Sequence, residues 1–108
     1  MIVCTTLGSD GAVGGGLGRA SRVAVAVVDD ARVSSWEEYD VGWDRLHDQG
    51  TEGAHHARIV KFLREHDVEV VVAAGIGPGM QRTLGSMGVR AVSGATGDAG
   101  EAVVRAAQ

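Results

Sequence analysis

The chain of 108 residues is long enough for one compact domain and too short for two, and its 44% hydrophobic and 22% charged residues are ordinary for a soluble globular protein. Its net charge of −4 without a basic cluster argues against a nucleic-acid partner, and it has no apolar run near a membrane span and no signal-peptide pattern. The single cysteine, Cys4, excludes an internal disulfide and favours a reducing, cytoplasmic setting.

The first half of the chain contains three predicted strands and two loops. Strand-like runs cover Ile2–Thr6, Arg22–Asp29 and Arg32–Tyr39, and the last two are separated by a tight turn, so we expect an antiparallel hairpin. The glycine-rich segment Gly8–Gly18 after the first run predicts a loop. The segment Asp40–Gly53 is polar and irregular.

The second half alternates between helix and strand. Apolar residues at helical spacing predict a helix at Ala54–His66, and the apolar run Val68–Ala73 is typical of a strand buried on both faces of a parallel sheet. We then expect a short helix at Met80–Met87 with Gly88 at its end, a strand at Val89–Val92, and a helix at Asp98–Ala107 with Asp98 as N-cap. The order β-β-β-α-β-α-β-α predicts an α/β fold with a mixed five-stranded sheet.

Three glycine-rich segments are expected to meet at one edge of this sheet. They are Gly8–Gly18, Gly75–Gly79 and Ser93–Gly97, and ligands of such sheets bind outside the carboxyl ends of the parallel strands. The glycines either serve tight turns alone or let the backbone approach a ligand, and their convergence favours a binding site. Met80 stands where a dinucleotide fingerprint needs its third glycine, and no Walker A motif follows.

Two histidines open the first long helix. The positive end of a helix disfavours imidazolium, and neutral imidazole is the form that ligates metals. Adjacent helix positions point about 100° apart, so we expect at most one of His55 and His56 to bind an ion. His47 lies in a less fixed loop, His66 is expected to be a structural cap, and solvated polar residues are the alternative for the first two.

The predicted site therefore lies between the first glycine loop, the Gly75–Gly79 turn and the start of the first long helix. Helix N-termini at Ala54 and Met80 would direct partial positive charge into it, each worth about 0.3–1 kcal/mol to an anion. The predicted binding residues are Gly15, Gly16, Gly18, Arg19, Gly53, His55, His56, Gly75, Gly77 and Gly79, with either His55 or His56 as the metal ligand.

The sequence offers few catalytic groups. Cys4 lies within the first strand, where a free cysteine is usually buried, and nothing pairs it with a base. The order of elements resembles a ribonuclease H-like motif, but the first strand has no carboxylate for two-metal phosphoryl transfer. One cysteine cannot build an iron–sulfur cluster, although one thiolate or imidazole can bind a preformed one. We interpret the domain as non-catalytic.

The aromatic residues of SSWEEYDVGW allow two interpretations. They either pack a strand and pin the following loop, or they form a lid over the glycine edge that carries His47. The first interpretation is favoured for Trp36, and both stay open for Trp43.

Three blocks of the sequence carry a family resemblance. They are GRA at Gly18–Ala20, GTEGAHHARIVKFLREHDVEVVVAAGIGPGM at Gly50–Met80, and ATGDAGEAVV at Ala95–Val104. With these blocks the chain resembles the dinitrogenase iron-molybdenum cofactor biosynthesis family, small domains related to nitrogenase accessory factors that carry the cofactor or its precursor. The resemblance spans nearly the whole chain and implies a three-layer α/β/α sandwich with a ribonuclease H-like motif.

The resemblance implies a non-catalytic carrier of a preformed iron–sulfur or iron-molybdenum type cluster, with cofactor-assembly proteins as partners. The alternatives are a small-molecule or anion-binding regulatory module that uses the glycine-rich loops and, less favoured, a hydrolase that depends on Cys4. An exposed edge on the hairpin favours a homodimer. Family members often read H-F-G-R-A where Gly16–Ala20 reads G-L-G-R-A here, and the loop with Trp43 and His47 is longer than expected.

Overall fold

Runs of β-branched residues form the five strands of one mixed sheet in the computed structural model, which describes residues 1–108. The strands are β1 (Ile2–Thr6), β2 (Arg22–Asp29), β3 (Arg32–Asp40), β4 (Val70–Val72) and β5 (Arg90–Val92). They lie in the order β3-β2-β1-β4-β5. β2 is antiparallel to both of its neighbours, and β4 and β5 run parallel to β1. This arrangement confirms the predicted α/β fold with its ribonuclease H-like order.

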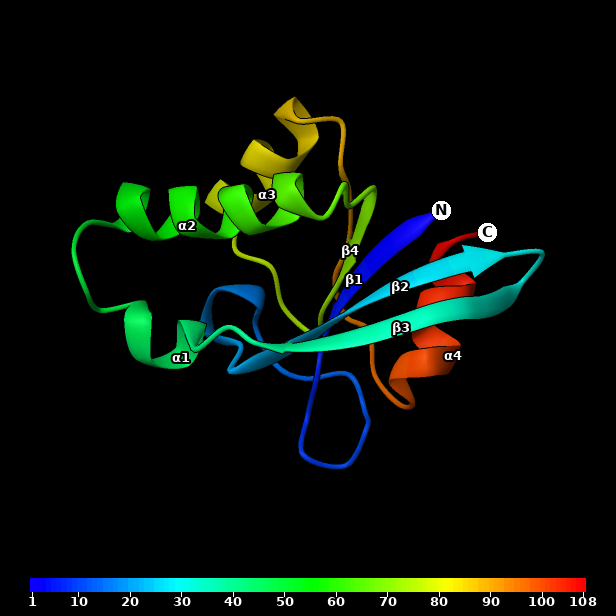
Figure 1. Cartoon of the computed structure of the whole chain (residues 1–108). Coiled ribbons are helices and arrows are strands. Elements are labelled where there is room, and N and C mark those ends of the chain that lie inside the picture. The colour runs from blue at the N-terminus through cyan, green and yellow to red at the C-terminus, as the bar shows by residue number, and fades with distance from the viewer.

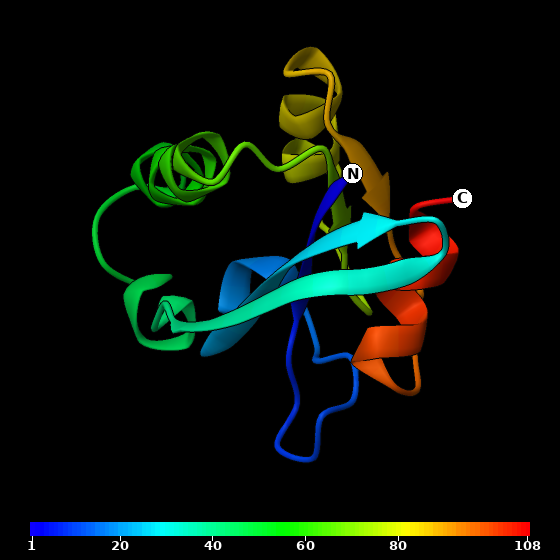
Figure 2. The same cartoon turned by 45° about the vertical axis from the view of Figure 1, so that its right-hand side comes forward.

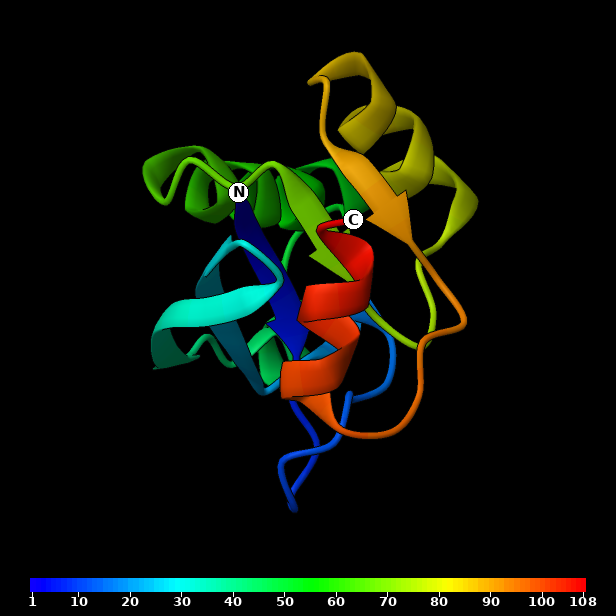
Figure 3. The same cartoon turned by 90° about the vertical axis from the view of Figure 1, so that its right-hand side faces the viewer.

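Helices cover both faces of the sheet, so the predicted three layers are confirmed (Figures 1 and 3). They are a 3-10 helix η1 (Leu17–Arg19) and the α-helices α1 (Trp43–Leu46), α2 (Glu52–Glu65), α3 (Pro78–Ser86) and α4 (Ala99–Ala106). α4 lies on one face alone, and α1, α2 and α3 lie on the other. None of these helices is long and apolar enough to cross a membrane.

Alternation along the strands divides the core in two. Val3 of β1 belongs to the cluster under α4, whereas its neighbour Cys4 belongs to the cluster under α2 and α3. In β4, Val70 and Val72 point towards α4 and Val71 points away from it. Because successive strand residues face opposite sides, a continuous apolar run is what a strand buried on both faces requires.

The main departures from the predicted elements are at their ends. α2 begins at Glu52 rather than Ala54, because the Thr51 side chain accepts the Ala54 amide at 3.0 Å and acts as N-cap. The segment expected to be irregular contains α1. At the other end of the chain, the Asp98 side chain accepts the Glu101 amide at 2.9 Å, which confirms the predicted cap of α4.

The segment around Trp43 is pinned to the core. The indole is 2% exposed and meets the Phe62 ring edge to face at a centroid distance of 5.5 Å. Tyr39 contacts the same Phe62 ring at 5.5 Å, and His66 packs on it at 4.3 Å. Burial of a large aromatic surface fixes the loop in place, so the packing interpretation holds for Trp43 and the lid does not.

The hairpin turn between β2 and β3 holds two residues in the left-handed conformation. Asp30 and Ala31 have φ angles of 50° and 60°, and Asp29 pairs directly with Arg32 across the turn. Such turns match the twist of the strands and favour Asn or Asp followed by glycine. Alanine at the second position carries a steric cost that glycine avoids.

We therefore expect Ala31→Gly to raise the free energy of unfolding by about 0.5–1 kcal/mol, measured by urea denaturation. The control is Ala57→Gly on the exposed face of α2, which should lower it by about 1 kcal/mol because the helix has no positive φ to relieve. Destabilisation by both substitutions would show that the turn is not strained at Ala31.

Candidate functional site

The three glycine-rich segments do meet at the carboxyl ends of the parallel strands. Loop Gly8–Gly18 follows β1 and lies below the sheet in Figure 2. Each half of the loop contacts another glycine-rich segment. In the first half, the Val13 amide donates to the Gly97 carbonyl at 2.8 Å. In the second half, Gly16 and Gly75 form a parallel bridge. The three loops thus contact one another through main-chain groups.

His55 locks the first glycine loop to α2. Its side chain is 6% exposed, with Nε2 at 2.7 Å from the Gly18 carbonyl oxygen and Nδ1 at 2.7 Å from a guanidinium nitrogen of Arg58. Arginine only donates, so Nδ1 accepts and the hydrogen on Nε2 is donated to Gly18. Both ring nitrogens of His55 are therefore hydrogen-bonded, and of the two histidines predicted as alternative metal ligands only His56 has ring nitrogens without a hydrogen bond.

His56 lines an open polar groove between α2 and α3, with a volume of about 550 Å³. The ring is 27% exposed, and its Nε2 lies 3.8 Å from the Glu52 carboxylate. A Cβ atom on Gly79 would approach the ring to 3.3 Å, so glycine lets α3 come this close. The groove contains no apolar side chain and is lined by Glu52, Gly53, His56, Gly79, Arg82, Thr83 and Ser86.

Only one of the two helix starts at the groove keeps uncompensated amides. α3 begins at Pro78, and its N-cap Gly77 has no side chain to accept the amides of the first turn. α2 is capped by Thr51 and carries the Glu52 carboxylate in its first turn, which offsets the positive end of the helix. The attraction for an anion therefore comes mainly from α3.

Arg82 is the cation of the groove and was not predicted from the sequence. Arg19, which was predicted, is exposed and lies outside the groove. Arg82 follows Gly79 by three positions, so both lie on one face of α3, and this spacing was the available signal. Among the predicted glycines, Gly53 and Gly79 line the groove, whereas Gly15, Gly16, Gly18, Gly75 and Gly77 do not.

Cys4 is a core residue. Its side chain is fully buried, and burial raises the pKa of the Cys4 thiol to about 12. The thiolate is the nucleophilic form of cysteine, so at neutral pH the hydrolase alternative has neither an accessible nor an ionised sulfur.

The groove does not have the ligands of a site for a bare metal ion. No three His, Cys, Asp or Glu side chains gather to hold a metal ion anywhere in the chain. A bare zinc ion takes about four ligands. A cluster that already carries its own ligands needs only one further ligand from the protein. His56 offers one imidazole in a place that solvent reaches.

Known proteins show both the fold and the family. The solved structure of PH0822 matches with a TM-score of 0.73 and 21% identity over 98% of this chain and 88% of the other, which supports the fold alone. No protein with a curated description matches significantly. The family model described as dinitrogenase iron-molybdenum cofactor matches residues 1–108. The chain therefore belongs to the dinitrogenase iron-molybdenum cofactor family.

Proposed function

We propose that this domain is a non-catalytic, cytoplasmic carrier that binds a preformed metal–sulfur cofactor or its precursor in the groove between α2 and α3. The observation that carries the proposal is the placement of His56, whose imidazole is partly exposed, makes no hydrogen bond and lies beside the uncapped start of α3. In this proposal His56 binds a metal of the cargo. Arg82 and the amides of the α3 start face the anionic part of the cargo.

A second candidate is an anion-binding regulatory module. Arg82 and the start of α3 support it, and it assigns no role to His56. The two candidates differ in what they require of the ligand. A carrier needs a metal for the imidazole, whereas an anion binder needs only negative charge. Glu52 at the rim opposes either ligand by charge repulsion, so Glu52→Gln should strengthen binding of both.

The test uses the full chain under anaerobic conditions with a thiolate-ligated synthetic [4Fe–4S] cluster. We expect charge-transfer bands in the visible spectrum of the protein fraction after gel filtration. His56→Ala should weaken cluster binding at least ~10-fold, because even partners outside the first ligand shell typically contribute that much to metal affinity.

His66→Ala is the matched control, since it removes a histidine of the same helix at the end remote from the groove. It should leave the bands unchanged. A protein that gains no visible bands would contradict the carrier function, and equal binding by the wild type and His56→Ala would remove histidine from the site. Competition by inorganic phosphate without any metal requirement would favour the anion binder instead.

A further inference from the structure

The free edge of β5 carries unpaired main-chain groups. β5 is the last strand of the sheet and pairs with β4 alone. The Arg90 amide donates to Glu69 at 3.0 Å and the Val92 carbonyl accepts the Ala73 amide at 3.0 Å, so Arg90 and Val92 face β4. Because residues of a strand alternate, the amide and carbonyl of Ala91 point outward. Such an edge is a template for another strand.

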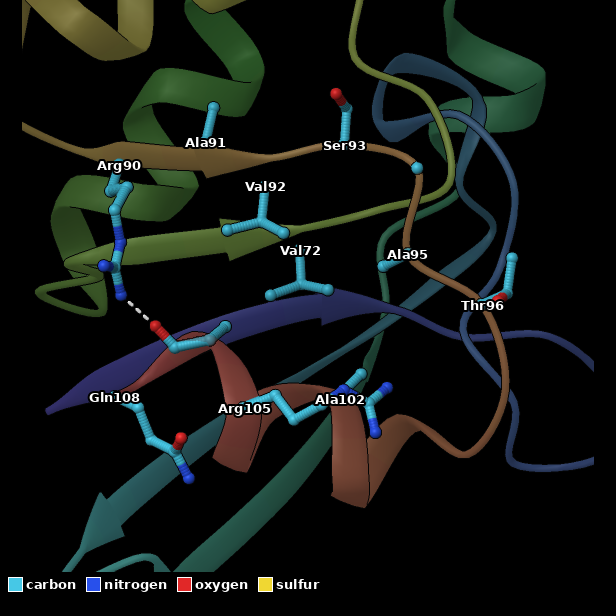
Figure 4. A pocket seen from close by; sticks show the side chains of 12 residues that line it. Val72, Arg90, Ala91, Val92, Ser93, Ala95, Thr96, Ala102, Arg105 and Gln108 are labelled. Atoms are coloured by element: carbon cyan, nitrogen blue, oxygen red, sulfur yellow. Dashed lines mark hydrogen bonds between the residues drawn. The ribbon is translucent and has the colours of Figure 1, made fainter.

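A groove of about 450 Å³ lies beside this edge, between β5 and α4 (Figure 4). It exists because α4 packs mainly over β1 and β4 and presents the small side chains Ala102 and Ala106 towards β5. Val72 and Val92 form an apolar floor, and their side chains point into the space between the strands and α4 (Figure 4).

The only charged side chains that line the groove are those of two arginines. Arg90 crosses from β5 to donate to the Ala106 carbonyl at the end of α4, and Arg105 projects from α4 without an ion pair. No acidic side chain lines the groove, although the chain has 14 acidic and 10 basic residues. Guanidinium groups keep several donors after one bond, so both arginines have donors left for carboxylates.

We propose that the β5 edge and its groove bind an acidic, extended peptide segment of a partner protein by strand addition. The added strand bonds to the outward amide and carbonyl of Ala91. Of the side chains of the added strand that face the groove, one lies beside Arg90, and the side chain two residues along the peptide lies beside Val92. This alternation selects a carboxylate and an apolar side chain separated by one residue.

A second copy of this chain does not fit the same place. Symmetric pairing of two β5 edges would bring Arg90 and Arg105 of both copies to one interface, and no acidic side chain lines the groove to offset them. Like charges at an interface oppose association. The site also lies on the α4 face of the sheet, across from His56, so this inference does not depend on the carrier function.

The test titrates the full ¹⁵N-labelled chain with the peptides Thr-Glu-Thr-Val-Thr and Thr-Val-Thr-Glu-Thr, which cover both strand directions, and with their lysine-for-glutamate counterparts. We expect one acidic peptide to shift the Ala91 and Ser93 amides and to slow hydrogen exchange at Ala91. Arg105→Gln should weaken that binding about 10-fold through loss of a charge-assisted hydrogen bond. Arg45→Gln on α1 is the matched control and should change nothing.

Ala91→Pro tests the strand pairing itself. Proline removes the outward amide but leaves the bonds to β4, which come from Arg90 and Val92, so the sheet should stay folded in the ¹⁵N spectrum. We expect this variant to lose peptide binding. Retained binding in Ala91→Pro, equal binding of the lysine peptides, or shifts confined to the β3 edge would each overturn the proposal. Equal affinity for acetylglutamate would also overturn it by showing a small-molecule site.

Discussion

Replacing His55 with alanine is expected to lower the free energy of unfolding by about 2–4 kcal/mol in urea denaturation. The ring occupies a buried position at the start of α2 and joins two segments that are far apart in the chain. Its loss leaves the Gly18 carbonyl without a donor, removes one of the two acceptors of the Arg58 guanidinium, and leaves a cavity. An unpaired polar group is costly when water cannot replace its partner.

His55→Gln distinguishes the hydrogen bond from the packing. The glutamine amide can donate to Gly18 as Nε2 does, so this variant should recover part of the lost stability. His56→Ala is the neighbouring control and should change stability by no more than about 0.5 kcal/mol, since the His56 ring makes no hydrogen bond and its one polar contact is the 3.8 Å approach to Glu52. Equal effects of the two alanine variants would show that His55 does not fasten the loop.

The second large effect is a loss of stability at alkaline pH that depends on Cys4. Its ordinary pKa of 9.0 applies in the unfolded chain, and burial raises the pKa to about 12 in the native state. Between these values the unfolded chain has released the thiol proton and the native protein has kept it. The contribution of the protonated Cys4 thiol to the free energy of unfolding is therefore fully present below pH 9. It falls as the pH rises, by about 2–3 kcal/mol between pH 9 and 11.

Cys4→Ala should remove this slope while leaving any other alkaline titration in place. The comparison is necessary because the pKa of Tyr39 is also raised, first by its hydrogen bond to Glu37, and tyrosine titrates in the same range. A thiol-alkylating reagent should modify Cys4 only when the chain unfolds. Rapid modification of the folded protein, or identical slopes for both proteins, would contradict the burial of the thiol.

Much of the fold was predictable because its signals are local. The nearly continuous apolar run around Val70–Val72 identified a strand buried on both faces, and Asp98 identified the start of α4. Element ends were less certain, since the start of α2 depends on the cap made by Thr51 rather than on the apolar pattern. The short α1 was not predicted because its four residues, of which Trp43 is the only buried one, are too few to show an apolar repeat at helical spacing.

Of the ten predicted site residues, only Gly53, His56 and Gly79 line the groove between α2 and α3. The sequence brought the glycine segments and the start of α2 to one edge, and they do lie there. It did not separate the roles of the two adjacent histidines. Nor did it identify Arg82, whose relevance depends on where α3 lies against α2.

By itself, the sequence determined the order of the elements, the division of the strands into two faces, and the family of the chain. Periods of 2.0 and 3.6 residues and cap residues act over a few positions, so they can be read without the fold. The tertiary structure decided which histidine is free, because the partner that occupies His55 lies 37 positions away in the chain. It also decided that the β5 edge stays open beside two arginines, because strand order and the position of α4 follow from packing between distant segments. Hydrogen-bond partners and exposed edges are set by these long-range contacts, which local sequence patterns do not encode.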